Sequence, residues 1–224
     1  MTYQDLKKEF KNLDVKLLDK FLNRLLEVNK IMNLTSITNK EDAIEKHLYD
    51  SLLVSKALSL DNKSILDVGS GGGFPGIPLA SYYPNAHFTL LDSTKKKCDY
   101  LIETIKYLGL KNVKVKCARV EELKEKEQYD VIVARALADL SIYLELVSKL
   151  VKINGTILAM KGKKAKEELA KSRYAIKELS LKLVNENYFQ TPSKEERYIL
   201  EFTKLKSTKK KYPRMYKDLI KRPL

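Results

Sequence analysis

The stretch Lys63-Ser-Ile-Leu-Asp67-Val-Gly69-Ser-Gly71-Gly72-Gly73-Phe74-Pro75-Gly76 decides the fold of this chain. Five of the eight glycines in the 224 residues lie between positions 69 and 76. A short apolar run ends in an acidic residue, a glycine turn follows directly, and a helix-like stretch comes next. Glycine at this density allows positive φ angles and lets a ligand lie against bare backbone. Between a strand and the start of a helix, such a loop is typical of a nucleotide-binding site.

The composition indicates a globular protein with a real core. The chain is 44% hydrophobic and 32% charged, and no apolar run approaches the roughly 20 residues that cross a bilayer. Its first ten residues lack the apolar region of a signal peptide. Cys98 and Cys117 show neither metal nor redox spacing, so both are interpreted as small buried hydrophobic residues. We therefore expect a cytoplasmic protein without a metal site or membrane contact. A monomer is a separate expectation, which the composition does not establish.

Charge is the second strong signal. The 43 basic and 29 acidic residues give a net charge of +14, which points toward a polyanionic partner. Most of the basic residues are lysines, so a lysine-rich proteome could account for part of the excess. The distribution is more specific, because Lys204–Leu224 contains nine basic residues against Asp218 alone. This concentration favours a nucleic-acid surface.

The order of elements predicts an α/β protein. Residues 1–60 show helical periodicity without strand character, and strand–helix alternation starts near residue 64. Strands are expected at 65–68, 87–91, 113–117, 129–134, 155–160, 180–190 and 195–205, and helices at 76–83, 95–108, 121–126, 139–150 and 163–178. Such alternation implies a mostly parallel sheet covered on both faces. We expect a helical N-terminal extension (1–60) packed on the core, a sheet domain (61–206) and a basic C-terminal tail (207–224).

Two nucleotide-binding motifs overlap in the glycine loop. The pattern from Gly71 to Gly76 satisfies the GxGxxG dinucleotide fingerprint, whereas Asp67-x-Gly69-x-Gly71-x-Gly73 matches S-adenosylmethionine-dependent methyltransferases. The first motif starts three residues after the strand ends, and the second starts the turn immediately after Val68. The register therefore favours the methyltransferase motif, with a nicotinamide-dependent oxidoreductase as the alternative.

The acidic residues at the strand ends fit a nucleoside. Asp92 closes the second strand, where its two oxygens could accept both ribose hydroxyls; its alternative role is a helix N-cap. Asp67 would orient the loop or meet the methionine end of the cofactor. Residues 118–122 follow the third strand, where an adenine would be read, although Glu121 and Glu122 could simply be acidic residues in the first turn of a helix.

The segment after the fourth strand bears on the methyl acceptor. Methylation of exocyclic amines usually employs an Asn/Asp-Pro-Pro-aromatic motif there, and this chain has Val133-Ala-Arg135-Ala-Leu137 instead. Neither cysteine is placed to attack a cytosine. Guanine N7 needs neither a base nor a nucleophile, because it carries a free lone pair, so positioning would suffice. Arg135 could anchor the pocket wall or a phosphate, or form a structural ion pair with a carboxylate such as Glu121.

Several motifs along the chain resemble one family, the bacterial small-subunit ribosomal RNA guanine-N7 methyltransferases, also called glucose-inhibited division protein B. The similar segments are 63–76, Leu90-Leu-Asp-Ser-Thr-Lys-Lys-Lys97, Arg119–Leu123, Ala134–Ala136, Met160–Gly162, Asn33–Thr35 and His47-Leu-Tyr-Asp-Ser-Leu52. The resemblance implies a class I methyltransferase, with a Rossmann-like seven-stranded sheet and a helical N-terminal extension. It also implies S-adenosylmethionine as methyl donor and a guanine in the decoding-region loop of 16S ribosomal RNA as acceptor.

The resemblance assigns residues to the cofactor. The family motifs carry over to Gly69, Phe74, Val120, Glu121 and Arg135, and the general methyltransferase pattern adds Gly71, Gly73, Asp92 and Asp67. His47 and Asp50 either line the mouth of the site or form a buried hydrogen bond with each other. No catalytic residue is assigned.

The predicted partner is 16S ribosomal RNA, in the small subunit or an assembly intermediate. Basic residues are expected to hold phosphates, namely Lys95, Lys96, Lys161, Lys163, Lys209, Lys210, Lys211 and Arg214. The end of the tail departs from the family, because it has no Gly-x-Pro turn after Arg214, and a short helix could replace that turn. An RNA-binding scaffold with a vestigial site and a methyltransferase for transfer RNA or protein are the competing hypotheses.

Overall fold

A single seven-stranded sheet forms the centre of the molecule in the computed structural model, which describes residues 1–224. The strands are β1 (Ser64–Val68), β2 (His87–Asp92), β3 (Val113–Cys117), β4 (Tyr129–Arg135), β5 (Val151–Lys161), β6 (Leu181–Gln190) and β7 (Glu196–Lys204). Their order is β3-β2-β1-β4-β5-β7-β6, and only β7 runs antiparallel to its neighbours. The predicted count of seven strands and the mostly parallel arrangement are confirmed.

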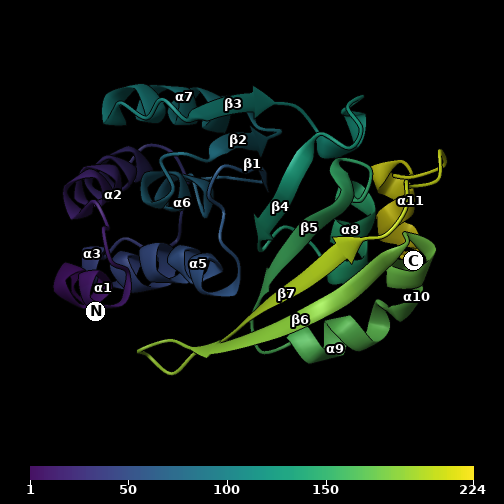
Figure 1. Ribbon diagram of the computed structural model, residues 1–224. Helices are drawn as coiled ribbons and strands as arrows, with labels where there is room; N and C mark the ends of the chain where they lie inside the picture. The colour runs from purple at the N-terminus through teal and green to yellow at the C-terminus, as the bar shows by residue number, and fades with distance from the viewer.

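Helices cover both faces of the sheet (Figure 1). One layer holds α1 (Tyr3–Glu9), α2 (Val15–Asn29), α3 (Lys40–Ala43), the π-helical turn η1 (Ile44–Tyr49), α4 (Asp50–Leu52), α5 (Val54–Ala57), α6 (Gly76–Tyr82) and α7 (Lys95–Leu108). The other holds α8 (Leu140–Val147), α9 (Ala165–Lys171), α10 (Arg173–Glu178) and α11 (Tyr216–Lys221). No helix is long and apolar enough to cross a membrane.

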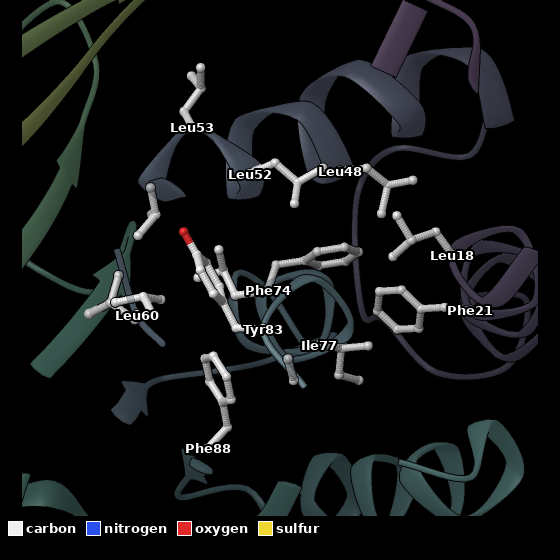
Figure 2. Close-up of a cluster of buried hydrophobic side chains, with 14 of the residues drawn as sticks. Leu18, Phe21, Leu48, Leu52, Leu53, Leu60, Phe74, Ile77, Tyr83 and Phe88 are labelled. Carbon is white, nitrogen blue, oxygen red and sulfur yellow. The ribbon is translucent and has the colours of Figure 1, made fainter. Parts of the chain in front are cut away.

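The N-terminal helices share one hydrophobic core with the sheet. In α2, Leu18, Phe21, Leu22 and Leu25 recur at helical spacing and are fully buried. They belong to a cluster of 32 buried residues that includes Phe74 of the glycine loop. Figure 2 shows Phe74 beside Phe21, with Leu48 and Leu52 on the helix above, and the Phe74 and Phe21 ring centroids lie 5.1 Å apart. The glycine loop is therefore supported from behind by the N-terminal extension.

Some expected elements differ from the structure. The helix expected at 121–126 is only a 3₁₀ turn, η2 (Val120–Glu122), because the charged run after Leu123 offers no apolar face to bury. Strand β5 begins at Val151, four residues before its expected start. It continues through Asn154, whose positive φ accommodates an irregularity opposite β4. The helix expected at 163–178 is divided into α9 and α10 at Ser172.

The interpretation of the cysteines was half wrong. Cys98 is buried on α7, but Cys117 is exposed. Cys117 is the last residue of β3, which is the strand at one edge of the sheet. An edge strand leaves one side uncovered, so the position does not bury a small side chain.

Candidate functional site

The glycine loop turns by left-handed backbone conformations. Gly69, Gly71 and Gly73 have φ angles of 73°, 54° and 100°. A Cβ atom at Gly69 would lie 2.7 Å from Leu137 Cδ1, and one at Gly73 would lie 2.6 Å from Ile77 Cδ1. At Gly71 a Cβ would meet only the Gly69 carbonyl oxygen, at 3.8 Å. The loop is thus tightly packed at Gly69 and Gly73 and open at Gly71, as expected of a loop that binds a ligand against its backbone.

Asp92 ties the loop to the start of α7. Its Oδ2 accepts a hydrogen bond from the Gly71 amide at 3.0 Å, and its Oδ1 accepts one from the Thr94 amide at 2.8 Å. The side chain therefore bridges two turns, and Thr94 rather than Asp92 is the N-cap residue of α7. Each carboxylate oxygen has a second lone pair for a ligand hydroxyl. The structure supports a structural role for Asp92 and leaves room for the predicted ribose contact.

Asp67 lies behind the loop. It is fully buried, and its Oδ2 accepts a hydrogen bond from the Gly76 amide at 2.9 Å, while its Oδ1 has no partner. Burial raises the pKa of this carboxyl to about 7. A Cβ on Gly76 would come within 2.6 Å of the same carboxylate. Asp67 therefore organises the turn into α6, in line with the expectation that it orients the loop.

A nucleotide pocket of about 320 Å³ opens beside the loop at the carboxyl ends of β1, β2 and β3. Four predicted cofactor contacts line it: Gly69, Asp92, Val120 and Glu121. Sequence reasoning missed several others, including Thr94, Leu137, Ala138 and Tyr216. The rule that sites form at the ends of parallel strands could have pointed to Leu137 and Ala138, which follow β4 directly. No local pattern pointed to Tyr216, which comes from the tail.

A second pocket, of about 610 Å³, adjoins the first. We call it the acceptor pocket. The two pockets share Ala136, Leu137 and Ala138, the segment that follows β4. The remaining walls come from the N-terminal extension and from β5 and β7, with Lys46, His47, Asp50, Met160, Lys161 and Arg197 among them. The nucleotide pocket is therefore built by neighbouring strands, and the acceptor pocket by segments far apart in the sequence.

Arg135 is fixed at the wall of the acceptor pocket. It donates to the Lys46 carbonyl at 2.9 Å and to Asp50 Oδ2 at 3.2 Å, and its guanidinium lies 5.1 Å from the Phe74 ring centroid. Asp50 is buried and also accepts from Arg197 Nε at 2.8 Å. The ion-pair partner of Arg135 is therefore Asp50 and not Glu121, which instead lies 3.7 Å from Arg119.

His47 is held in its neutral form. Burial, together with the nearby charge of Arg135, lowers the pKa of His47 to about 3. Its Nδ1 lies 3.1 Å from Arg135 and its Nε2 lies 2.8 Å from Thr35 Oγ1, and the ring stacks on Phe74. His47 and Asp50 both line the acceptor pocket, and they meet through Arg135 rather than through a hydrogen bond to each other.

The structure does not bring all predicted cofactor residues into the nucleotide pocket. Phe74 points into the hydrophobic cluster and is 5% exposed. Arg135 lines the acceptor pocket. Gly73 packs against Ile77, and Asp67 is buried beneath the turn. Gly71 lines neither pocket. Direct contact of these five residues with the cofactor therefore stays a prediction.

The basic residues predicted to bind RNA fall into two groups. Lys96, Lys163 and Lys210 are exposed and have no ion-pair partner. Others are already paired: Lys95 with Asp99, Lys161 with Glu168, Lys209 and Lys211 with Glu178, and Arg214 with Glu145. Exposed pairs of this kind exchange easily for a phosphate, because they are worth little in water. Lys161 and Arg214 differ, since their partners hold them against the protein.

The fold and the loop together define the class. A seven-stranded sheet with one antiparallel strand next to the edge, a glycine turn after β1, an acidic residue ending β2 and a pocket across the ends of β1 to β3 describe a class I methyltransferase. The open face of Gly71 and the Asp92 carboxylate that lines the pocket fit a polar ligand at this loop. The predicted fold class is confirmed.

Comparisons with known proteins identify the family. The family model described as GidB, rRNA small subunit methyltransferase G, matches residues 14–199. A relative from Mesoplasma florum, named ribosomal RNA small subunit methyltransferase G, is 42% identical over 91% of this chain and 87% of its own length. One of the same name from Fusobacterium nucleatum is 40% identical, over 92% and 89%. The chain belongs to the GidB family, which confirms the predicted family and the prediction of an S-adenosylmethionine-dependent methyltransferase.

Solved structures with low sequence identity share the fold. M. jannaschii TYW2, solved in complex with AdoMet, superposes with a TM-score of 0.58 at 19% identity, covering 76% of this chain and 80% of that one. A SAM-dependent methyltransferase from Aquifex aeolicus gives 0.56 at 16% identity, covering 80% and 97%. The oxidoreductase hypothesis finds no support in these comparisons.

Proposed function

We propose that the protein transfers a methyl group to N7 of a guanine in 16S ribosomal RNA of the small subunit. One observation carries the proposal: the nucleotide pocket and the acceptor pocket meet at Ala136–Ala138, so a donor in one faces an acceptor in the other. S-adenosylmethionine supplies an electrophilic methyl group when bound. The names of the family model and of the relatives support ribosomal RNA of the small subunit as the substrate.

The acceptor pocket suits an atom that needs no deprotonation. Asp50 is engaged by two arginines, and both ring nitrogens of His47 lie within hydrogen-bonding distance of Arg135 or Thr35. Neither side chain is therefore free to act as a base. Guanine N7 carries its own lone pair, so the protein needs to position the base and exclude water. This chemistry supports N7 over an exocyclic amine.

The acceptor base has to leave its helix to react. In A-form RNA the N7 edge lies in a deep, narrow major groove that side chains reach poorly. A loop base that is splayed from its stack fits a pocket of about 610 Å³. Arg135, Arg197 and Lys46, which line this pocket, would hold the flanking phosphates. In this proposal the protein acts in the cytoplasm as a monomer, on the small subunit or on an assembly intermediate.

Transfer of labelled methyl groups tests the acceptor. The protein is incubated with tritiated S-adenosylmethionine and, separately, naked 16S RNA, small subunits, assembly intermediates and transfer RNA. We expect label in 16S RNA only, on one guanine, as N7-methylguanine. The Asp92→Ala variant serves as the control with a weakened cofactor site. Label on transfer RNA or protein, or no label in any assembly state, would overturn the proposal.

A further inference from the structure

The C-terminal tail returns to the nucleotide pocket. Strand β7 ends at Lys204, and the remaining residues pass α10 and α8 before forming α11 (Figure 1). Tyr216, the first residue of α11, lines the nucleotide pocket together with Asp92, Val120 and Glu121. These three follow or end strands β2 and β3, so the tail reaches the same pocket from a distant part of the chain.

Two anchors precede Tyr216 in the sequence. The Tyr212 hydroxyl donates to Glu178 at 2.9 Å, and its ring is buried. Arg214 binds Glu145 of α8 with both ends of its guanidinium, from Nε to Oε1 at 2.9 Å and from Nη2 to Oε2 at 2.6 Å. The Arg214 amide also donates to Glu145, whose carboxylate is fully buried. Such a bidentate, charge-assisted contact fixes position and direction together.

A third anchor follows Tyr216 and sets its direction. Leu219 is fully buried in the same hydrophobic cluster as Val120 and Leu146. Residues three apart on a helix share a face, so the Tyr216 side chain faces the side on which Leu219 is buried. The residue nevertheless stays 42% exposed, and it lines the pocket. Anchored residues before and after Tyr216 in the sequence fix its position, while its side chain stays accessible from the pocket. A ligand in the pocket can therefore pack against the Tyr216 ring.

We infer that Tyr216 is part of the cofactor site, where its ring packs against the adenosine part of S-adenosylmethionine. The inference rests on the proposed function in one respect only, the identity of the cofactor. Val120 and Glu121 lie where the adenine is expected, and Tyr216 lines the same pocket, so the tail contributes to that end of it. Contact between an aromatic ring and a base tolerates many geometries and is strong. The tail thereby acts as a wall of the cofactor site as well as a basic segment.

Calorimetry with S-adenosylhomocysteine, the stable product, tests the contact on the full chain. Tyr216→Ala is expected to weaken binding about tenfold, and Tyr216→Phe to bind within about twofold of the parent, because the ring and not the hydroxyl makes the contact. Tyr174→Ala is the matched control, since Tyr174 is exposed on α10 and lines neither pocket. The melting temperature without ligand should be the same for all variants, which separates the contact from folding.

A second readout uses the absence of tryptophan from the sequence. Tyr216→Trp introduces a single reporter, and saturating S-adenosylhomocysteine should quench or shift its emission. Tyr174→Trp should show no change. Binding by Tyr216→Ala within twofold of the parent, or unchanged emission from Tyr216→Trp at saturation, would each overturn the inference.

Neither measurement contains RNA, so the two proposals fail separately. A protein that binds S-adenosylhomocysteine through Tyr216 but methylates another substrate would overturn the proposed function and leave this inference intact. A protein that methylates 16S RNA and binds the cofactor equally well without the ring would do the reverse.

Discussion

The two adjoining pockets are built in different ways. The nucleotide pocket is formed chiefly at the ends of β1, β2 and β3, between Val68 and Glu121, and residues 136–138, Leu146 and Tyr216 complete it. The acceptor pocket depends on long charged side chains from the N-terminal extension, β4 and β7, joined at Asp50. The donor side therefore depends mainly on the sheet, with Tyr216 of the tail added to it, whereas the acceptor side exists only when the N-terminal extension has docked.

Asp50→Asn should affect the acceptor pocket far more than the nucleotide pocket. It removes the carboxylate shared by Arg135 and Arg197, and it leaves both guanidinium groups without their common anionic partner. Loss of one partner from a buried ion network costs about 3–5 kcal/mol, and part of that appears as misplacement of the acceptor. We expect methyl transfer to RNA to fall at least about 100-fold, while S-adenosylhomocysteine affinity stays within about threefold.

The matched control for Asp50→Asn is Asp42→Asn. Asp42 is an exposed residue of α3 whose only ion pair, with Lys46, spans 3.9 Å. It should change neither quantity. Equal losses of transfer and of cofactor affinity in Asp50→Asn would show that the two pockets are not separable.

Asp92→Ala tests the donor side alone. The substitution removes the acceptor for the Gly71 and Thr94 amides and the predicted ribose contact. Cofactor affinity should fall about 10- to 100-fold, measured by calorimetry, from the loss of one or two charge-assisted hydrogen bonds. Asp99→Ala, on the exposed side of α7, is the control and should bind normally. Unchanged affinity in Asp92→Ala would reduce Asp92 to a structural link between the two turns.

His47 makes the acceptor side sensitive to acid. Its pKa is about 3 in the folded protein and 6.5 ordinarily, so the unfolded chain binds the extra proton between these values. The contribution of His47 to stability is therefore complete above about pH 6.5 and is lost as the pH falls toward 3. At pH 5 the loss should be about 2 kcal/mol.

Denaturant unfolding of the parent and of His47→Gln between pH 5 and 8 measures this effect. The variant should lack that part of the pH dependence. Asp67 acts in the opposite direction, since its raised pKa removes stability as the pH rises toward 7, and it contributes equally to both proteins. Parallel curves for parent and variant would show that His47 titrates normally.

The smallest expected effect is on the salt dependence of RNA binding. Lys210 is exposed and unpaired, between Lys209 and Lys211, which lie against Glu178. Lys210→Ala should reduce the slope of log affinity against log salt by about 0.7–0.9, the amount expected for one phosphate contact. Lys7→Ala, on α1 far from the tail in Figure 1, should leave the slope unchanged. An unchanged slope in Lys210→Ala would remove this part of the tail from the RNA surface.

Because the two pockets are built differently, the sequence predicts the residues of the nucleotide pocket better than those of the acceptor pocket. Asp67, Gly69 and Asp92 stand at the ends of consecutive strands, and parallel strands bring those ends to one edge, so spacing along the chain predicts proximity. Asp50 and Arg197 are separated by 147 residues, and only the docking of the extension against β7 brings them together. No local pattern encodes such a pair. Tyr216 is a similar case, because its placement depends on a buried carboxylate in α8.

The sequence also does not predict the directions in which two of the site's side chains point. Phe74 follows the glycine turn, where a cofactor contact is plausible, yet its ring turns into the hydrophobic cluster because α2 supplies Phe21 on that side. Arg135 stands at the end of β4, inside a strand that was expected to stop one residue earlier, at residue 134, and its side chain turns toward η1. In both cases the N-terminal extension decides the direction, and periodicity gives no information about which residues of another element will face a given position.

The pairing of Arg214 with Glu145 has a consequence during synthesis. Glu145 is a fully buried anion whose only countercharge comes from a residue translated 69 positions later. A chain that stops before Arg214 retains that anion without its cation, at an expected cost of about 3–5 kcal/mol. Because a whole domain is commonly stable by only about 5–15 kcal/mol, such truncated chains would unfold readily and be open to proteolysis. Stable folding of α8 and of the core around it therefore depends on Arg214, a residue of the C-terminal tail.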